Sequence, residues 1–510
     1  MMKKTNVFGG GIRRICAVAA ASTATGMAAL VRAGLRETPT IEVRLDWLRG
    51  DAQRIRFLHW LKQYKPRGAT FIATCRRREG GGRFPGSLEA ELGWLARARA
   101  AGCAWCDLEV ETLRRLRGKS LRDLGLPAKI LLSLHDFRSI PARLESFGSR
   151  AQTVADAVKI AANASTIGQS ARFLDLTSRI EKLVLVPMGE VGLPARILAL
   201  RYGSALAYAP IGQATAPGQV SLHDLKHLYR AHELNNATGV HGVIGDPVGH
   251  SLSPLLHNTG FIAAKLNAVY LPFLVKNLLD FLKAAPEFGI RGFSVTIPHK
   301  QSILRHLREC DPLAAEIGAV NTVVVRHDGS LFGCNTDYSG ILRALERKLE
   351  LYGSRVLIFG AGGAARAAAF ALTKAGARVV VCARRESAAN ELARAVGGET
   401  VPRRALRSEK FDAILNATPI GMHPRDKVSP LTARELNCGL VMDLISRPQE
   451  TQLLKIARRK GIATIPGVEM FLPQGFAQWE LWTGQRAPER IMRKAVLEAL
   501  RSEEKSRQHA

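Results

Sequence analysis

A lysine near the end of an apolar run is the most informative residue in the first half of the chain. Lys159 lies in the run VKIAANA, among small and aliphatic neighbours. A lysine in such a place must be neutral, ion-paired, or extended so that its ammonium reaches solvent. Because burial lowers the pKa of an amine, an uncharged lysine there could attack a ketone and form an imine. A lysine that simply reaches solvent from a strand end is the alternative.

Other polar residues stand at or beyond the ends of comparable apolar runs, where the packing of a core does not require them. Together with Lys159 they form a coherent set of candidate site residues: Glu42, Arg44, Arg76, His135, Arg196 and Gln219. A lone histidine is more often structural, so His135 gains its interest from this company.

The elements that would position this set are short apolar strands alternating with amphipathic helices, from about residue 15 to residue 234. This alternation is typical of parallel strands joined by helical crossovers. A last helix is expected at 222–234. The eight predicted strands lie at residues 15–22, 40–47, 69–76, 104–110, 129–136, 157–164, 182–189 and 205–212. Eight such units predict a TIM barrel, in which chemistry gathers at the carboxyl ends of the strands.

Four motifs in this segment resemble type I 3-dehydroquinate dehydratase in order and spacing. They are EVRLDW at 42–47, SLHDF at 133–137, VKIA at 158–161 and APGQVS at 216–221. The resemblance implies an imine between Lys159 and a substrate ketone, with His135 as general acid and base. The chemistry suits these groups, because a protonated imine acidifies the adjacent C–H bond, and one imidazole can take that proton and later protonate a departing hydroxyl.

The same resemblance assigns the rest of the set. Arg196 would hold the substrate carboxylate through a bidentate pair, and Glu42, Arg44, Arg76 and Gln219 would order its hydroxyls. Thr215 stands where the family usually has a serine and is a further candidate contact. The stretch TCRRREGGGRF is about one residue shorter than usual, so either Arg76 or Arg77 could face the substrate. Glu79 is the implied partner of His135 on that register.

The second half of the chain resembles shikimate dehydrogenase. The motifs HGVIGDPVGHSLSPLLHN from residue 241, GFSVTIPHK at 292–300, GAVNTV at 318–323 and GCNTDYSG at 333–340 follow the family order. The resemblance implies a catalytic dyad of Lys300 and Asp337, since hydride loss from a carbinol carbon requires its hydroxyl proton to leave as well. An exposed Lys–Asp salt bridge is the alternative. The implied substrate contacts are Ser251, Ser253, Thr296, Asn321 and Gln474.

Three details of this half leave alternatives open. Ser253 before Pro254 could equally be a helix N-cap. Ser294 replaces a usual asparagine and Ser446 a usual tyrosine, both on the substrate side, so quinate is an alternative to shikimate as the substrate.

A dinucleotide-binding pattern follows at residue 355. The strand RVLIFG leads into GAGGAARA and a helix, and then into RVVVCARR. Gly360 and Gly362 would permit the tight turn and the close approach of a pyrophosphate, with Gly363 and Ala364 at the helix start. The second strand ends in Arg384 and Arg385 where NAD enzymes carry an acid, which favours NADP over NAD. A solvated basic patch is the alternative. NATPIGM at 416–422 and GVEM at 467–470 resemble nicotinamide-side loops, which makes Thr418 and Gly467 weaker candidate contacts.

Composition sets limits on the whole chain. A length of 510 residues suits two or three domains, and 46% hydrophobic with 23% charged residues argues against extensive disorder. The fold class expected is α/β, an N-terminal TIM (β/α)8 barrel followed by a two-lobed shikimate dehydrogenase unit, an α/β substrate lobe plus a Rossmann NADP lobe. The expected boundaries are 12–236 for the barrel, 239–345 for the substrate lobe with helices of 467–502 returning to it, and 346–466 for the Rossmann lobe.

Charge and cysteine content bear on partners and compartment. The formal charge of +29 would attract polyanions, but no nucleic-acid motif or aromatic-interleaved basic tract is present. We expect no nucleic-acid or membrane partner. The eight cysteines show no metal-ligand spacing, so we expect no metal and a reducing cytoplasm. Cys103 and Cys106 flank a predicted strand, which favours packed thiols over a redox centre. The apolar run 15–31 imitates a secretory signal poorly, because polar residues interrupt it.

The two resemblances cover nearly the whole chain and describe consecutive reactions. They predict a bifunctional enzyme that dehydrates 3-dehydroquinate to 3-dehydroshikimate through a lysine Schiff base and reduces that product to shikimate with NADPH. The alternatives are a dehydrogenase half that prefers quinate, a chain in which one domain is catalytically inactive and only binds, and a function of the positive charge in nucleic-acid or membrane association. The sequence does not indicate the oligomeric state.

Overall fold

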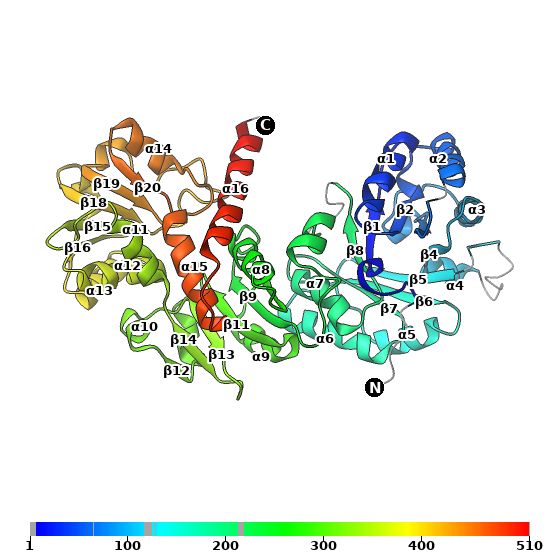
Figure 1. Ribbon diagram of the computed structural model, residues 1–510, viewed down its shortest axis with the longest axis horizontal. Coiled ribbons are helices and arrows are strands. Elements are labelled where there is room, and N and C mark those ends of the chain that lie inside the picture. Colours follow the sequence, from blue (N-terminus) through cyan, green and yellow to red (C-terminus); the bar gives the residue numbers. More distant parts are fainter. Residues whose placement is uncertain (1–6, 65, 117–124, 128, 213–218, 509–510) are drawn as a thin grey trace. The chain divides into compact units, whose positions relative to one another are not determined.

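The computed structural model describes residues 7–64, 66–116, 125–127, 129–212 and 219–508 (Figure 1). Contacts divide the chain into two compact units. The first is Met1–Thr238 together with Phe273–Phe288, and the second is Gly239–Pro272 together with Gly289–Ala510.

The first unit is built on eight parallel strands in the order β7-β6-β5-β4-β3-β2-β1-β8. The two ends of this sheet, β7 and β8, also contact each other, so the sheet nearly closes into a barrel. The strands are β1 (Ile15–Ala19), β2 (Thr40–Arg44), β3 (Thr70–Thr74), β4 (Trp105–Glu109), β5 (Lys129–Asp136), β6 (Ala157–Asn163), β7 (Leu183–Met188) and β8 (Ala207–Pro210). This confirms the predicted barrel.

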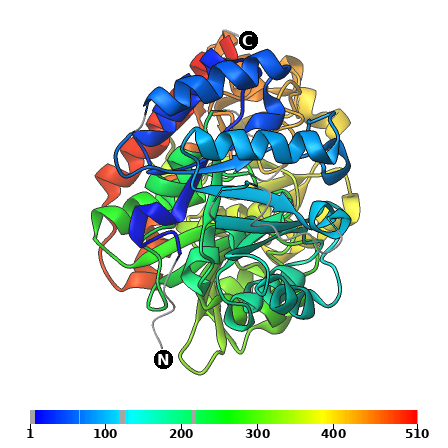
Figure 2. The same cartoon turned by 90° about the vertical axis from the view of Figure 1, so that its right-hand side faces the viewer.

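Helices cover the outside of these strands, and the first of them, in blue, are seen from the side in Figure 2. Several begin at a polar cap, as at Thr23, whose hydroxyl accepts a hydrogen bond from the backbone N–H of Gly26 at 3.1 Å. The helices are α1 (Ala24–Leu35), α2 (Asp51–Tyr64), α3 (Leu88–Ala100), α4 (Val110–Arg115), α5 (Leu144–Ala151), α6 (Ile167–Arg179) and α7 (Leu193–Tyr202).

The last helix of the barrel is shorter than the sequence predicted. It ends at Leu228 instead of residue 234. Arg230 has a φ of 47° in the left-handed region, which an α-helix cannot contain. The prediction was wrong there because apolar spacing continued beyond the point where the backbone turns.

The second unit holds two sheets. The first is mixed, with the order β10-β9-β11-β13-β14-β12, and β13 lies antiparallel to both β11 and β14. Its strands are β9 (Gly239–Gly245), β10 (Ala268–Leu274), β11 (Ile290–Val295), β12 (Glu309–Cys310), β13 (Thr322–Val325) and β14 (Leu331–Cys334). The helices of the second unit in this part of the sequence are α8 (Ser253–Ala263), α10 (Pro312–Ile317) and α11 (Asp337–Leu345), while α9 (Leu278–Phe288) belongs to the first unit by its contacts.

The other sheet is parallel throughout and has the order β17-β16-β15-β18-β19-β20. Its strands are β15 (Arg355–Phe359), β16 (Arg378–Cys382), β17 (Glu399–Thr400), β18 (Phe411–Asn416), β19 (Cys438–Asp443) and β20 (Ala463–Ile465). They alternate with α12 (Gly363–Lys374), α13 (Glu386–Ala395) and α14 (Gln452–Arg459). This is the predicted dinucleotide-binding arrangement.

Two helices at the end of the chain return to the first lobe of this unit. The helix α15 (Val468–Thr483) packs on α11 and α8, and α16 (Glu489–Gln508) packs on α8. Figure 1 shows both beside the strands of the mixed sheet. Within the part of the chain that the structure describes, no helix is long and apolar enough to cross a membrane.

Candidate active sites

Lys159 is buried inside the barrel and ion-paired. Its side chain is only 6% exposed, and its Nζ lies 2.7 Å from Oδ2 of Asp107 and 3.8 Å from Oε1 of Glu42. The lysine therefore does not extend to solvent. Burial acts to raise the pKa of the Asp107 carboxyl, but the positive charges of Lys159 and Arg76 outweigh it and hold that pKa below its usual value.

His135 faces a carboxylate from the neighbouring strand. Its Nδ1 lies 3.0 Å from Oε1 and 3.2 Å from Oε2 of Glu109, the last residue of β4. Burial, reinforced by the charge of Arg76, lowers the pKa of His135, while Glu109 opposes that shift. The imidazole is thus neutral near pH 7 and able to take up a proton.

The prediction that Glu79 is the partner of His135 was wrong. The Glu79 side chain is 57% exposed and pairs with Arg77 at 3.1 Å and Arg115 at 2.8 Å. The shortened loop explains this, because residues 78–80 form a single 3-10 turn and Gly81 reverses the chain with a φ of 78°. The Glu79 side chain is left outside the barrel mouth, and motif register alone could not show it.

The choice between Arg76 and Arg77 is resolved by their partners. Nε of Arg76 lies 2.6 Å from Oε1 of Glu109, and its Nη2 lies 3.4 Å from Oδ1 of Asp107. Arg77 instead pairs with Glu91 at 2.7 Å. Arg76 is therefore the arginine that joins the cluster around Lys159 and His135.

Arg196 carries a buried guanidinium with few hydrogen-bond partners among the described residues. It lies on α7 and is 7% exposed, and its Nε has no hydrogen-bond partner in the described part of the chain. Among the described residues, its Nη2 has one hydrogen-bond acceptor, the backbone oxygen of Tyr208, at 3.5 Å. Burial lowers its pKa to about 10. An arginine in this state favours an anionic ligand.

The other predicted barrel residues are found in three situations. Arg44 makes a two-point pair with Asp46, at 2.9 and 2.8 Å, and Glu42 accepts a hydrogen bond from Thr74 at 2.6 Å. Gln219 is half-buried just before the last helix. Thr215 lies outside the described residues.

Two acids and a tyrosine were missed by the sequence analysis. Asp107 and Glu109 alternate along β4, so their side chains point to the same side of the sheet. The ring of Tyr208, on β8, lies 4.3 Å from Nζ of Lys159. Its hydroxyl is buried without a hydrogen-bond partner among the residues that the structure describes. Polar residues at alternate positions of an apolar strand were the signal that could have identified the two acids.

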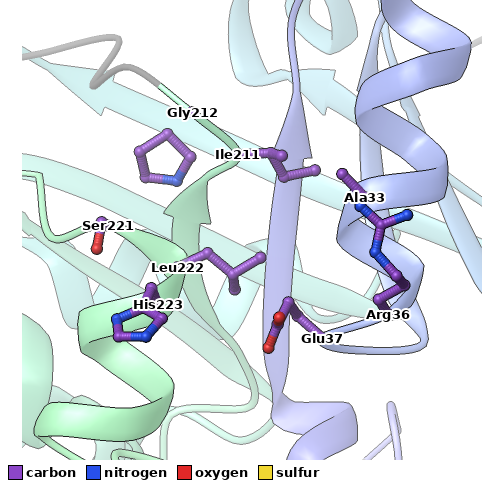
Figure 3. A pocket seen from close by; sticks show the side chains of 9 residues that line it. Ala33, Arg36, Glu37, Ile211, Gly212, Ser221, Leu222 and His223 are labelled. Atoms are coloured by element: carbon purple, nitrogen blue, oxygen red, sulfur yellow. The ribbon is translucent and has the colours of Figure 1, made fainter.

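A separate pocket of about 340 Å3 lies between the end of α1 and residues 210–212 and 221–223 (Figure 3). Its polar lining includes Arg36, Glu37 and His223. None of the predicted catalytic or binding residues that the structure describes in the barrel lines it, and we assign it no part in the chemistry.

The second unit holds another lysine and carboxylate pair. Nζ of Lys300 pairs with Oδ2 of Asp337, and the side chain of Asp337 is 4% exposed. The Asn321 amide donates to Oδ1 of Asp337 at 2.8 Å and to Oε1 of Gln474 at 3.3 Å. The structure therefore brings together four parts of the chain, the loop after β11, the residue before β13, α11 and α15, and excludes an exposed salt bridge.

The two predicted carboxylate-binding serines, Ser251 and Ser253, lie at the start of α8, in the same unit as Lys300 and Asp337. Ser253 is 7% exposed and is already inside α8, while the hydroxyl of Ser251 accepts a hydrogen bond from the Ser253 backbone N–H at 3.2 Å. The alternative of Ser253 as N-cap was wrong by this geometry, because Ser253 has helical backbone and Leu252 precedes the helix. Thr296 follows β11 and is half-buried.

Ser294, which replaces the usual asparagine, has two internal partners. Its hydroxyl lies 2.5 Å from the Tyr270 hydroxyl and donates to Oε1 of Gln478 at 2.9 Å. Gln478 in turn donates to the Thr322 hydroxyl at 3.1 Å. Ser294 therefore anchors α15 against the mixed sheet.

The glycine turn after β15 is shaped for a dinucleotide. Gly360 has a φ of 125°, and a Cβ on Gly363 would lie 2.9 Å from Cβ of Lys300, so the start of α12 reaches the Lys300 site only as glycine. Ala364 is the second residue of α12 and Gly362 precedes it. Arg384 and Arg385 follow β16 and are exposed. Two guanidinium groups at this point fit the 2′-phosphate of NADP.

The two weaker contacts have internal roles in the structure. The Thr418 hydroxyl donates to Oδ1 of Asn416 at 2.7 Å, which shapes the turn after β18. A Cβ on Gly467 would lie 2.3 Å from the backbone oxygen of Ile445, so the start of α15 requires glycine there. Within the described residues, no cluster of His, Cys, Asp and Glu could hold a metal ion.

Fold and sites define a class of protein, a lysine-containing α/β barrel joined to a two-lobed dehydrogenase with a dinucleotide-binding lobe. Family models match in the same order: type I 3-dehydroquinase at residues 15–236, the shikimate dehydrogenase substrate binding domain at 243–323, and the shikimate 5'-dehydrogenase C-terminal domain at 467–497. The chain belongs to the family of bifunctional 3-dehydroquinate dehydratase/shikimate dehydrogenases, a lyase and an oxidoreductase in one polypeptide.

Individual relatives support this assignment. The chloroplastic bifunctional 3-dehydroquinate dehydratase/shikimate dehydrogenase of Arabidopsis thaliana is 35% identical over 480 residues, which cover 88% of this chain and 78% of that protein. The shikimate dehydrogenase (NADP(+)) of Methanosarcina acetivorans is 43% identical over 279 residues, 52% of this chain and 99% of that protein. A crystal structure of a shikimate dehydrogenase with NADP+ is 39% identical, covers 52% of this chain and 97% of its own, and has a TM-score of 0.48. The name of the Methanosarcina relative confirms the prediction of NADP for the dehydrogenase half of the family.

Proposed function

We propose that the barrel dehydrates 3-dehydroquinate through an imine on Lys159 and that the second unit reduces the resulting 3-dehydroshikimate to shikimate with NADPH. One observation carries the proposal: each unit pairs a lysine, buried in the barrel and half-buried in the second unit, with a buried carboxylate, next to further groups that suit one of two consecutive reactions.

In the barrel, the amine of Lys159 attacks the ketone once its proton has been given up, and water leaves to form the imine. The imine's positive charge acidifies the neighbouring C–H bond, and His135 removes that proton. The resulting enamine expels the hydroxyl group, which His135 protonates as it leaves. Arg196 holds the substrate carboxylate, and Glu42, Arg44, Arg76, Thr215 and Gln219 order the remaining hydroxyls. Hydrolysis of the product imine returns Lys159.

In the second unit, Lys300 gives a proton to the ketone oxygen while the carbonyl carbon is reduced. Asp337 keeps the lysine in place, and the Asn321 amide that donates to Asp337 fixes its orientation. Asn321, Thr296 and Gln474 order the substrate hydroxyls, and Ser251 and Ser253 bind its carboxylate.

NADPH, when bound, supplies the hydride for this reduction. The residues that would hold it are Gly360, Gly362, Gly363, Ala364, Arg384, Arg385, Thr418 and Gly467. The glycine turn and the start of α12 would face the pyrophosphate, since backbone N–H groups at a helix start favour anions.

The extents we propose are 12–236 for the dehydratase barrel, 239–345 for the substrate lobe with helices of 467–502, and 346–466 for the NADP lobe. We place the protein in the cytoplasm, where its free cysteines would stay reduced. Burial raises the pKa of the Cys103 thiol to about 12, which favours packed thiols there over a redox centre.

The test is mass spectrometry of the intact protein after incubation with 3-dehydroquinate and borohydride, followed by peptide mapping. We expect a reduced adduct on Lys159. Protein that forms no adduct but still reduces 3-dehydroshikimate with NADPH would show that the barrel is inactive. An adduct on another lysine would refute the assignment of Lys159.

A further inference from the structure

One strand of the barrel supplies a carboxylate to each of the two reactive groups. Asp107 contacts Nζ of Lys159 at 2.7 Å, and Glu109, two residues later on β4, contacts Nδ1 of His135 at 3.0 Å. Alternate residues of a strand point to the same side, so a single stretch of backbone fixes both contacts. The register places these side chains on one side of the sheet, because Glu109, Ser133 and Lys159 pair side by side across β4, β5 and β6, and His135 lies two residues after Ser133.

Glu109 is itself held in place. Its side chain is 6% exposed, and Nε of Arg76 lies 2.6 Å from its Oε1. A Cβ on Gly80 would lie 3.2 Å from Cγ of Glu109, so the loop packs closely against this side chain. A carboxylate clamped in this way defines the position of the imidazole more sharply than a mobile one.

The contact also determines which ring nitrogen can act as the base. A carboxylate only accepts hydrogen bonds, so a neutral His135 keeps its hydrogen on Nδ1 and leaves Nε2 as the basic nitrogen. Glu79, the acid that motif register indicated, cannot do this from its exposed position beside Arg77 and Arg115.

We propose that Glu109 is the positioning residue for His135 in the dehydration, and that Glu79 has no part in it. The inference rests on the proposed role of His135 as the general acid and base. Glu109 acts through the imidazole and does not touch the substrate.

The experiment compares E109Q with E79Q, the same chemical change on two acids of one site region, in the full-length protein. For E109Q we expect kcat of the dehydration to fall by about 100-fold or more, with KM changed by less than about threefold. The acid limb of its pH profile should move to lower pH, because Glu109 favours the protonated imidazole. E79Q should stay within about twofold of the unchanged enzyme, since its ion pairs are exposed.

Three further measurements keep the outcomes separate. Borohydride trapping of Lys159 with 3-dehydroshikimate reports that the E109Q barrel is folded and forms the imine. E109D keeps the charge beside Arg76 but shortens the side chain, so kcat should fall without loss of thermal stability even if E109Q does not fold. H135Q tests the parent proposal, because a fully active H135Q would refute the role of His135 itself. If H135Q is inactive while E109Q and E109D retain normal kcat and pH profile, or if E79Q loses as much as E109Q, the inference about Glu109 is overturned.

Discussion

At the residue scale, two buried arginines of the barrel differ in how many hydrogen-bond partners the protein gives them. Arg54 is 4% exposed, and its guanidinium donates to the backbone oxygens of Leu45 and Leu48 at 3.1 and 3.0 Å and pairs with Asp51. Arg196 is similarly buried, but among the residues that the structure describes its guanidinium has one weak contact, at 3.5 Å. A buried guanidinium with so few partners is unfavourable for folding, so a ligand carboxylate is the simplest reason for its presence.

The comparison predicts opposite consequences for R196M and R54M. R196M removes an uncompensated buried charge, so the free energy of unfolding should stay the same or rise, while KM for 3-dehydroquinate increases by about 100-fold. R54M removes a fully bonded side chain and leaves acceptors without donors, so stability should fall by about 3 kcal/mol with KM unchanged. Urea unfolding and steady-state kinetics measure both. A destabilised R196M with normal KM would mean that Arg196 is structural.

At the element scale, the buried histidine of β9 makes the second unit sensitive to acid. His241 is 4% exposed, and burial, with a smaller effect from Arg291, lowers its pKa to about 3 from an ordinary 6.5. Between pH 3 and pH 6.5 this histidine is protonated in the unfolded chain but not in the folded chain. Its contribution to the free energy of unfolding is therefore fully present above pH 6.5 and falls with decreasing pH, by up to about 1.4 kcal/mol per pH unit.

The variant H241F should remove that part of the acid sensitivity. The ring packs between Phe261 and Trp482, each at 5.4 Å between centroids, where a phenylalanine ring can be accommodated. Urea unfolding of the second unit at pH 7 and pH 5 gives the slope with pH, which should be lower in H241F. H327Q, which changes an exposed histidine of the same unit, is the control and should leave the slope unchanged. An equal slope in H241F and the parent protein would contradict the prediction.

The start of α12 approaches the Lys300 site closely, so the position of this helix should affect the reduction. A Cβ on Gly363 would lie 2.9 Å from Cβ of Lys300, so G363A must push the helix and the lysine apart. We expect a higher KM for NADPH and a kcat reduced by about tenfold or more, because small displacements at a reacting centre are costly. G439A, where the nearest atom is 3.6 Å away, should be neutral. Normal kinetics in G363A would show that the close approach has no functional part.

Elements were predictable from the sequence more reliably than contacts. All eight barrel strands follow from apolar runs between helical patterns, and the glycine turn follows from its place between two strands. The pairing of His135 did not follow, since motif register indicated Glu79, and only the length and path of the loop decide where that side chain lies. Asp107 and Glu109 were within reach, because two acids at alternate positions of a buried strand need a partner on the same side.

At the scale of the whole molecule, we expect the formal charge of +29 to attract the anionic substrates. Both proposed reactions act on small carboxylates, and a positive field raises the local concentration of anions near a site. The buried acids of the two sites do not oppose this, because each is already paired with a lysine or an arginine.

The division of the assigned residues between two units predicts that the two activities can be removed one at a time. Every residue assigned to the dehydration lies in the first unit, and every residue assigned to the reduction lies in the second. K159M should abolish dehydration, because no amine is left to form the imine, yet leave NADPH-dependent reduction of 3-dehydroshikimate within about twofold. K300M should do the reverse. Each rate is measured on its own substrate, so neither depends on the other reaction. If K159M also lost the reductase activity while remaining folded, the two sites would be coupled through the chain, and the description of two independent catalytic units would have to be abandoned.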